Sequence, residues 1–159
     1  MLIYRLSHKD YSQNPYSGEG GHFAAGRWNL LGTLMAHASA SRALAFLELA
    51  VRLRSAELRT INRLYRVTPA EIPGQLKVLE IKEADLPHAW RATPPLVETQ
   101  TLGTQWISEK RFLVISVPSA ILPAERNYLI NPNHPEFSRI KLLPNESLNI
   151  ELRVLKRMP

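Results

Sequence analysis

Residues 18–48 read GEGGHFAAGRWNLLGTLMAHASASRALAFLE, and this stretch predicts how the rest of the chain is organised. It starts as a glycine-rich loop, continues through the Arg-Trp-Asn triplet at 27–29, and ends in an apolar segment with helical spacing. Glycine-rich loops let the backbone approach a ligand closely, and the planar guanidinium of Arg27 suits phosphate or carboxylate oxygens. The stretch therefore predicts a binding site in which a loop delivers Arg27 beside a helix.

The apolar segment predicts the dominant helix of the chain, over about 42–54, with Ser39 or Ser41 as its cap. The helix is apolar around most of its circumference, and its narrow polar stripe contains Glu48 and Arg52. A glutamate four residues before an arginine is typical of an exposed ion pair. The spacing alone therefore leaves open whether Glu48 is a surface residue or a functional carboxylate.

The remaining segments read mostly as strands. Alternating or β-branched patterns predict strands over 2–6, 34–37, 61–67, 76–81, 111–117, 127–131, 139–143 and 148–155. Residues 7–21 form a polar loop, 85–103 a long surface excursion, and 104–110 a short helix. Many strands with one dominant helix, in no regular alternation, predict an α+β fold in a single domain over 1–159.

The composition excludes several classes of protein. The absence of cysteine rules out disulfides, thiolate metal sites and a cysteine nucleophile. No apolar run approaches the length that spans a bilayer, so we expect a soluble, cytoplasmic protein that does not bind membranes. The net charge of +6 suits an acidic partner, but the basic residues are scattered, which disfavours a nucleic-acid-binding surface.

Common catalytic motifs are missing from the chain. There is no Walker A sequence, and the glycines at 18 and 20 lack the third glycine of a dinucleotide-binding loop. The five histidines are far apart and form no metal-binding pair, so we expect no metal. Ser119 lies outside any G-x-S-x-G sequence, and its place after a proline at a strand end is more typical of a turn.

At the level of whole segments the sequence resembles the RES domain family. The matching pieces follow one another through nearly the whole chain: Gly26-Arg27-Trp28-Asn29 with Gly32; Ser41, Ala45 and Glu48; Gly103-Thr104-x-Trp106; Val117-Pro118-Ser119-Ala120; Asn127-x-Leu129-x-Asn131-Pro132 with His134-Pro135-x-Phe137; and Glu151-x-Arg153. Each piece is short, and their order makes the resemblance specific.

The resemblance implies a fold, an activity and a partner. RES proteins are toxins of type II toxin–antitoxin systems, paired with Xre-type antitoxins that carry a helix-turn-helix, and their fold resembles that of ADP-ribosyltransferases. Their activity is the destruction of NAD by hydrolysis or phosphorolysis of the nicotinamide–ribose bond. We therefore expect NAD as the substrate, no further cofactor, and DNA contacted only through the antitoxin.

The family's arginine, glutamate and serine align with Arg27, Glu48 and Ser119, which the resemblance marks as catalytic residues. Glu48 would stabilise the cationic ribosyl centre, and Arg27 would hold the pyrophosphate. Ser119 would bond to the ribose or to the nicotinamide amide.

Four further contributions to NAD binding are expected. Arg5 offers a second phosphate contact, Trp28 or His37 a ring face, and Asn131 assistance from its segment. Each has a structural alternative: an edge-strand charge for Arg5, core packing for Trp28 and His37, and turn chemistry for Asn131. His37 stands where the family usually has tyrosine, and because histidine titrates near neutrality this departure bears on the pH optimum.

Other functions stay open at this point. Some RES proteins ADP-ribosylate a protein, so a mono-ADP-ribosyltransferase is the closest alternative. The positive charge also allows a non-catalytic nucleic-acid-binding or adaptor module. An endoribonuclease is a weaker option, because no histidine pair or basic stripe supports it.

Overall fold

The computed structural model of the protein describes residues 1–151 and 153, and its mixture of strands and helices confirms the predicted α+β class. The strands are β1 (Leu2–His8), β2 (Ala36–Ser39), β3 (Tyr65–Glu71), β4 (Val78–Glu80), β5 (Val114–Pro118), β6 (Arg126–Ile130), β7 (Lys141–Leu142) and β8 (Glu146–Ser147). The helices are α1 (Arg42–Ala50), α2 (Ser55–Leu58), α3 (Ile61–Leu64) and α4 (Val97–Ser108), with 3-10 turns at Lys9–Tyr11, Glu19–His22, Glu83–Asp85 and Phe137–Arg139. Even α4, the longest of these helices, is far too short to cross a lipid bilayer.

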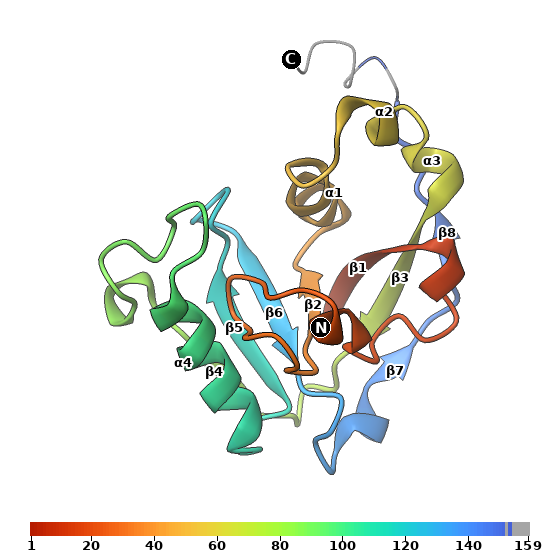
Figure 1. The fold of residues 1–159 in the computed structure, drawn as a ribbon. Helices are drawn as coiled ribbons and strands as arrows, with labels where there is room; N and C mark the ends of the chain where they lie inside the picture. Colours follow the sequence, from red (N-terminus) through yellow and green to blue (C-terminus); the bar gives the residue numbers. More distant parts are fainter. Residues whose placement is uncertain (152, 154–159) are drawn as a thin grey trace.

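The strands form a curved sheet with the order β4-β5-β6-β2-β1-β3-β7, and β8 adds to β3 (Figure 1). Neighbouring strands are antiparallel except for the parallel pair β4–β5. β1 pairs with β3 along its whole length, but within the described residues β1 and β2 share only the pair of Tyr4 with Ser39. The sheet therefore opens between β1 and β2, and its two halves diverge from there.

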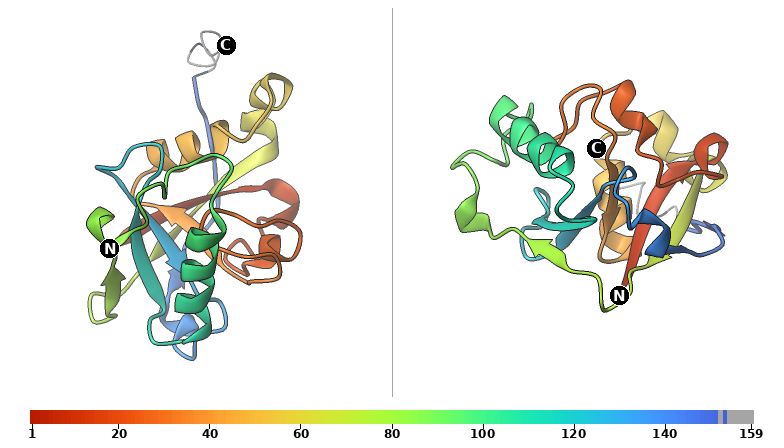
Figure 2. Two further views of the ribbon diagram at one scale, coloured as in Figure 1. Left: turned by 60° about the vertical axis from the view of Figure 1, so that its left-hand side comes forward. Right: turned by 90° about the horizontal axis from the view of Figure 1, so that it is seen from below.

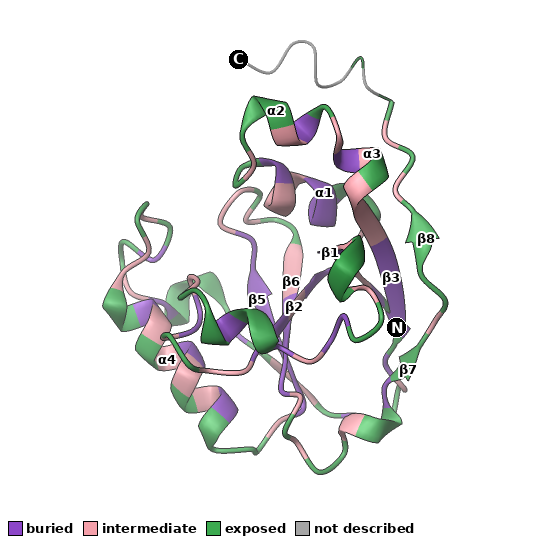
Figure 3. Ribbon diagram, turned by 45° about the vertical axis from the view of Figure 1, so that its right-hand side comes forward, coloured by how far each residue is buried: buried purple, intermediate pink, exposed green. Residues whose placement is uncertain are grey.

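Apolar side chains fill both faces of the sheet. β5 is buried along its whole length, because it lies inside the sheet and its β-branched residues pack on both sides (Figure 3). One face packs into a cluster that includes Ile3 and Val114. The other face packs against α4 and the loop before β2, through Ile115, Trp28 and Ile107. β7 and β8 lie exposed at the outer edge.

The long segment 9–35 links β1 to β2 and passes between α4 and the β1 half of the sheet (Figure 2). α4 holds this segment, because Gln100 Nε2 donates a hydrogen bond to the Gly26 carbonyl at 2.9 Å and Thr104 Oγ1 accepts one from the Leu30 amide at 2.9 Å. At Gly103 the helix comes so close that a Cβ atom there would lie 2.0 Å from the Trp28 carbonyl oxygen. Contacts with α4 therefore fix the turn that carries Arg27.

α1 begins where the sequence predicts and ends four residues earlier than expected, at Ala50. Ser41 is its cap, and Ser41 Oγ accepts a hydrogen bond from the Leu44 amide at 3.1 Å. The chain then turns into α2, whose start is stabilised by Glu57 Oε2 accepting from the Arg54 amide at 2.9 Å. This second cap competes with a longer α1, so Arg54 caps a new helix that begins at Ser55.

Helices occur in two places where the sequence predicted other structure. Residues 61–64 form α3 instead of the first half of a strand, because Ile61 packs with Phe46 and Leu58 in a cluster under α1. The surface excursion expected over 85–103 ends at α4, and the helix expected over 104–110 is the second half of α4. The buried face of α4 includes Thr99 and Gly103, so it lacks the apolar periodicity that would have marked it.

The other predicted strands differ mainly in their ends. β2 lies two residues later than the predicted 34–37, and the strand expected over 139–143 shrinks to β7. Residues 148–151 are not a strand, and β8 lies just before them. The rest of the strand predicted over 148–155 includes 152, 154 and 155, which lie outside the described residues.

Candidate active site

The candidate site lies where β1 and β2 diverge. Where a regular ladder would continue, the Arg5 side chain crosses the opening, and its Nη1 donates a hydrogen bond to the His37 carbonyl at 2.7 Å. Burial lowers the pKa of Arg5 from its ordinary value, but a guanidinium stays protonated at neutral pH. Arg5 thus brings a partly buried positive charge to the opening.

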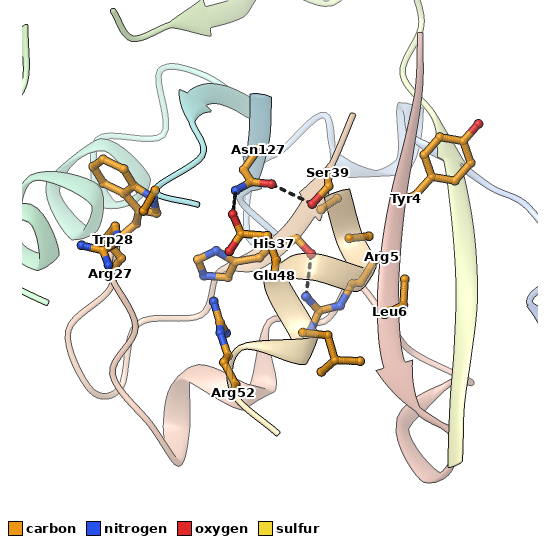
Figure 4. Close-up of a pocket in the computed structure, with 14 residues that line it drawn as sticks. Tyr4, Arg5, Leu6, Arg27, Trp28, His37, Ser39, Glu48, Arg52 and Asn127 are labelled. Atoms are coloured by element: carbon orange, nitrogen blue, oxygen red, sulfur yellow. Dashed lines mark hydrogen bonds between the residues drawn. The ribbon is translucent and has the colours of Figure 1, made fainter. Parts of the chain in front are cut away.

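A pocket with a volume of about 110 Å³ occupies this opening (Figure 4). Its walls come from β1, β2, α1 and β6, with contributions from the 27–28 turn and from Ala120 after β5. Of the residues singled out in the sequence, Arg5, Arg27, Trp28, His37 and Glu48 line it. The fold therefore brings together side chains that are widely separated along the chain.

Glu48 lies in this pocket with one side of its carboxylate held by the protein. Its Oε1 accepts hydrogen bonds from Ser119 Oγ at 2.8 Å and from Asn127 Nδ2. Asn127 is in turn oriented by Ser39, whose Oγ donates to Asn127 Oδ1 at 2.7 Å. No hydrogen bond to Oε2 occurs among the described residues, so this oxygen is the one left for a ligand.

The pocket carries an excess of positive charge. Arg5, Arg27 and Arg52 line it against the carboxylate of Glu48. The described residues contain no salt bridge between Glu48 and Arg52, so the surface ion pair allowed by their spacing is not formed. His37 adds no charge, because burial and the nearby Arg52 and Arg5 lower the pKa of His37 to about 3. Such a pocket suits an anionic group.

Arg27 is anchored by backbone carbonyls. Its Nη1 donates to the carbonyls of Trp90 and Ala92, the latter at 3.0 Å. In the described part of the chain Nε and Nη2 have no partner, which leaves one edge of the guanidinium for a phosphate or carboxylate. Partial burial lowers the pKa of Arg27 from its ordinary value and the charge of Glu48 opposes this shift, so Arg27 stays cationic.

Trp28 is mainly a core residue. Its ring stacks with that of Trp90, with a centroid distance of 6.0 Å, and lies 5.9 Å from the ring of Trp106. Only 4% of Trp28 is exposed, although it contributes to the pocket wall. The aromatic cluster supports the turn that carries Arg27.

Comparison with known families identifies the chain. The RES domain family matches residues 2–151, which include every lining residue of the pocket. The chain belongs to the RES domain family. This confirms the resemblance that the ordered motifs indicate.

Curated relatives of this RES protein are toxins. A Sphingobium protein named "Prs ADP-ribosylating toxin" is 37% identical over 134 residues, which are 84% of this chain and 82% of that protein. A "Toxin Res" of Photorhabdus laumondii is 31% identical over 98% of both chains. A "Toxin Res" of Yersinia enterocolitica is 30% identical over 86% of this chain and 88% of that protein. We conclude that this RES protein is a toxin as well.

A solved structure supports the fold. A chain of the crystal structure of the M. tuberculosis MbcT-MbcA toxin–antitoxin complex superposes with a TM-score of 0.73 over 98% of this chain and 86% of that chain, at 17% sequence identity. The two chains therefore share their overall fold.

Ser119, the serine aligned with the family's name, lies behind Glu48 and not in the pocket wall. It is 0% exposed, and its Oγ accepts hydrogen bonds from the amides of Ile121 and Leu122, both at 3.1 Å, while donating to Glu48. The sequence analysis expected Ser119 to bond to the ribose or to the nicotinamide amide. Its hydroxyl has no free capacity for such a bond. Its contact is with the carboxylate.

Asn131, expected to assist in the site, is not among the residues that line the pocket. It is buried just after the last residue of β6, whereas Asn127 lies near the start of that strand. Its Nδ2 donates to the Ile107 carbonyl at 2.8 Å, and its Oδ1 accepts from the Asn133 amide at 3.0 Å. Asn131 thus joins the end of α4 to the turn after β6. Its role is therefore the structural one that the sequence analysis gave as the alternative.

Sequence reasoning missed three residues of the site: Ser39, Asn127 and Arg52. Ser39 and Asn127 are directly opposite each other in the β2–β6 ladder, a register that one sequence does not reveal. Each is a small polar residue in an otherwise mostly apolar short strand, and that pattern could have marked them. Within residues 1–151 and 153, no group of three His, Asp or Glu side chains is arranged to hold a metal ion.

Proposed function

We propose that this RES protein is an enzyme that cleaves the bond between nicotinamide and ribose in NAD and passes the ADP-ribosyl group to water or inorganic phosphate. The observation that carries the proposal is the Glu48 carboxylate in an arginine-lined pocket: its Oε1 is held by Ser119 and Asn127, while its Oε2 has no hydrogen-bond partner among the described residues. The family resemblance supplies NAD as the substrate.

The proposed chemistry needs a single carboxylate. As the C1′–N bond breaks, its electron pair leaves with nicotinamide, which departs as a neutral base and requires no acid. Positive charge develops on the ribosyl ring, and a fixed carboxylate in a partly buried pocket stabilises that charge. An oxygen of water or phosphate then bonds to C1′. When water is the acceptor, it loses a proton, and Glu48 Oε2 can take up that proton.

The arginines fit the phosphates of the same substrate. Arg27 has its Nε and Nη2 edge free among the described residues, so it can bind a phosphate through two parallel hydrogen bonds. Arg5 and Arg52 add charge from β1 and from the residues after α1. Together they would hold the pyrophosphate and so place the ribosyl bond beside Glu48.

A second candidate function is the transfer of ADP-ribose to a protein. It is favoured by the relative named Prs ADP-ribosylating toxin, which is 37% identical to this chain. The same bond is broken and the same residues act on the donor. Only the acceptor differs, since a protein side chain replaces water or phosphate.

A protein partner belongs to the proposal. The similar fold from M. tuberculosis was solved as a toxin–antitoxin complex. We expect an inhibitory antitoxin of the Xre type with a helix-turn-helix, and contact with DNA only through it, as the family resemblance implies. Co-purification of the chain with the product of the neighbouring reading frame tests this pairing.

The direct test is to incubate the purified chain with NAD and to measure free nicotinamide. Glu48→Gln keeps the shape of the side chain and removes its charge, so we expect a loss of about 10²- to 10³-fold, and Arg27→Gln should raise KM. Glu98→Gln, at an exposed position in the first turn of α4, is the matched control and should keep full activity.

The products distinguish the candidate functions. Free ADP-ribose indicates hydrolysis, its 1″-phosphate indicates phosphorolysis, and a labelled protein in a cell extract indicates ADP-ribosylation. Growth arrest by the wild type but not by Glu48→Gln separates an enzyme from a non-catalytic basic module. If the wild type releases no nicotinamide with water, phosphate or extract as acceptor, the proposed function is wrong.

A further inference from the structure

Arg126, the first residue of β6, lies directly before Asn127 but points to the other face of the sheet. Asn127 faces the pocket, where its amide donates to Glu48 (Figure 4). Neighbouring residues of a strand point to opposite faces, and Tyr128, which shares the side of Arg126, belongs to the core cluster with Ile3. Arg126 therefore lies behind the site and does not line the pocket.

The guanidinium of Arg126 joins three segments of the sheet. Its Nη2 donates hydrogen bonds to the carbonyls of Ile81 and Ser116, both at 2.8 Å. Its Nε donates to Ser116 Oγ at 2.9 Å. Ile81 directly follows β4, and Ser116 lies in β5. The side chain thus ties the start of β6 to β5 and to the end of β4.

These bonds reinforce an end of the sheet where the ladder is weak. The β5–β6 ladder ends at the pair of Pro118 with Arg126, and proline has no amide hydrogen to donate. Among the described residues no carboxylate forms a salt bridge with Arg126, although its side chain is half-buried. Moving a charge out of water is costly, so the bonds to neutral acceptors account for an arginine here better than charge pairing does.

The backbone beside Arg126 supports both groups that hold the carboxylate of Glu48. The Ser119 amide donates to the Glu125 carbonyl at 3.0 Å, and Ser119 Oγ donates to Glu48 Oε1 at 2.8 Å. Asn127, on the other side of Arg126, donates to the same oxygen. Residues 125–127 are therefore a common support for the two donors.

The same segment also contacts β2. The Ala40 amide donates to the Arg126 carbonyl at 3.0 Å. Ala40 directly follows Ser39, whose hydroxyl orients the amide of Asn127. A shift of the start of β6 would therefore move every hydrogen bond in the chain from Ser39 to the carboxylate.

We propose that Arg126 is a positioning residue for NAD cleavage. Its guanidinium fixes the start of β6 from behind the sheet, so that Ser119 and Asn127 hold Glu48 on the opposite face. This inference rests on the proposed function, since it concerns the carboxylate that acts on the ribosyl bond. Arg126 makes no contact with the pocket, so its loss should lower kcat and leave KM, which depends on the pocket arginines, nearly unchanged.

The first test measures nicotinamide release by variants of Arg126. Arg126→Met keeps the length of the side chain and removes its donors, so kcat should fall about tenfold while KM stays within about twofold. Arg126→Lys keeps the cation but cannot bridge all three acceptors, so this milder variant should give an intermediate kcat. Wild-type kcat in both variants, or a raised KM with an intact kcat, overturns the inference.

Arg66→Met is the matched control. Arg66 is also half-buried, its Nη1 donates to three backbone carbonyls within 62–65, and it does not line the pocket. It should keep the wild-type kcat. An equal loss of kcat in Arg66→Met and Arg126→Met would mean that any arginine removed from the fold has this effect, which also overturns the inference.

A double-mutant cycle tests the route from Arg126 to Glu48. In the Asn127→Ala background one of the two donors is already gone, so adding Arg126→Met should lower kcat by less than about threefold. If the two losses instead multiply in full, Arg126 acts independently of Asn127 and the proposed route is wrong.

A measurement by NMR needs no NAD and separates the inference from the proposed function. Hydrogen exchange of the Asn127 side-chain amide, whose signals disappear in Asn127→Ala, should be at least about fivefold faster in Arg126→Met and unchanged in Arg66→Met. Equal exchange in the wild type and Arg126→Met overturns the inference even where NAD is cleaved. If exchange changes as expected but the wild type releases no nicotinamide, the proposed function fails while the link from Arg126 to Asn127 stands.

Discussion

Ser119 Oγ donates a hydrogen bond to Glu48 Oε1 at 2.8 Å, across 71 positions of sequence. The bond joins the end of β5 to the middle of α1, and it is made by a serine without solvent exposure. Because the same oxygen also accepts from Asn127, the carboxylate is fixed before any ligand arrives. Ser119 and Glu48, two of the three residues that give the family its name, are thus hydrogen-bonded to each other. The third, Arg27, lines the same pocket as Glu48.

Replacing Ser119 with alanine tests whether this serine orients Glu48 or touches the substrate. We expect kcat for nicotinamide release to fall by about 10- to 100-fold with little change in KM, because the carboxylate is misplaced while the phosphate contacts remain. The amides of Ile121 and Leu122 lose their acceptor, so the free energy of unfolding should drop by about 1–3 kcal/mol in urea titrations. A raised KM with an intact kcat would instead indicate a direct contact between Ser119 and NAD.

Asn127 provides a sharper test of the same arrangement. Asn127→Asp replaces the donor to Glu48 with a second carboxylate and should reduce kcat/KM by more than about 100-fold, because like charges repel in a partly buried site. Ser39→Ala leaves the amide in place but frees its orientation, so a loss of about tenfold is expected. Asn133→Asp, at an exposed turn, serves as the control. Equal losses for Asn127→Asp and Ser39→Ala would contradict the proposed chain of hydrogen bonds.

The parts of the site that could be predicted are those that depend on residue type and order. Arg27 and Glu48 belong to motifs in the quoted stretch, and the structure brings them to one pocket with Arg5 and His37. Asn131 was expected to assist in the site, but it lies just after the end of β6, and Asn127 near the start of β6 contacts Glu48 instead. The two asparagines are four residues apart, which is roughly 13 Å along an extended chain, so only one of them reaches Glu48.

What could not be predicted depends on contacts between distant segments. The pairing of Ser39 with Asn127 follows from the β2–β6 register, and the opening between β1 and β2 from a ladder that stops after Tyr4. The first half of α4 escaped prediction because its buried face presents Thr99 and Gly103 where an apolar stripe is normally seen. Tertiary packing requires a glycine at position 103, because Trp28 packs directly against it.

That close packing predicts the effect of adding one methyl group. At Gly103 an added Cβ would lie 2.0 Å from the Trp28 carbonyl oxygen, so Gly103→Ala must push α4 away from the turn that carries Arg27. We expect a loss of about 1–3 kcal/mol in the free energy of unfolding, together with reduced NAD cleavage. Gly74→Ala is the control, because an added Cβ there meets nothing within 4 Å. Equal urea midpoints for the two variants would show that α4 tolerates the shift.

His37 predicts how stability depends on pH. Its pKa is about 3 in the folded protein, against an ordinary value of 6.5, so the unfolded chain binds this proton more readily. The contribution of neutral His37 to the free energy of unfolding is fully present above pH 6.5 and is lost as the pH falls toward 3. His37→Tyr introduces the residue usual in the family, which is uncharged over this range, and should remove a slope of at most about 1.4 kcal/mol per pH unit. Urea unfolding at pH 7 and pH 5 measures the difference, with His88→Tyr, at an exposed position, as the control variant. If wild type and His37→Tyr lost stability in parallel on acidification, the imidazole would have to take up its proton in the folded state, beside Arg5 and Arg52.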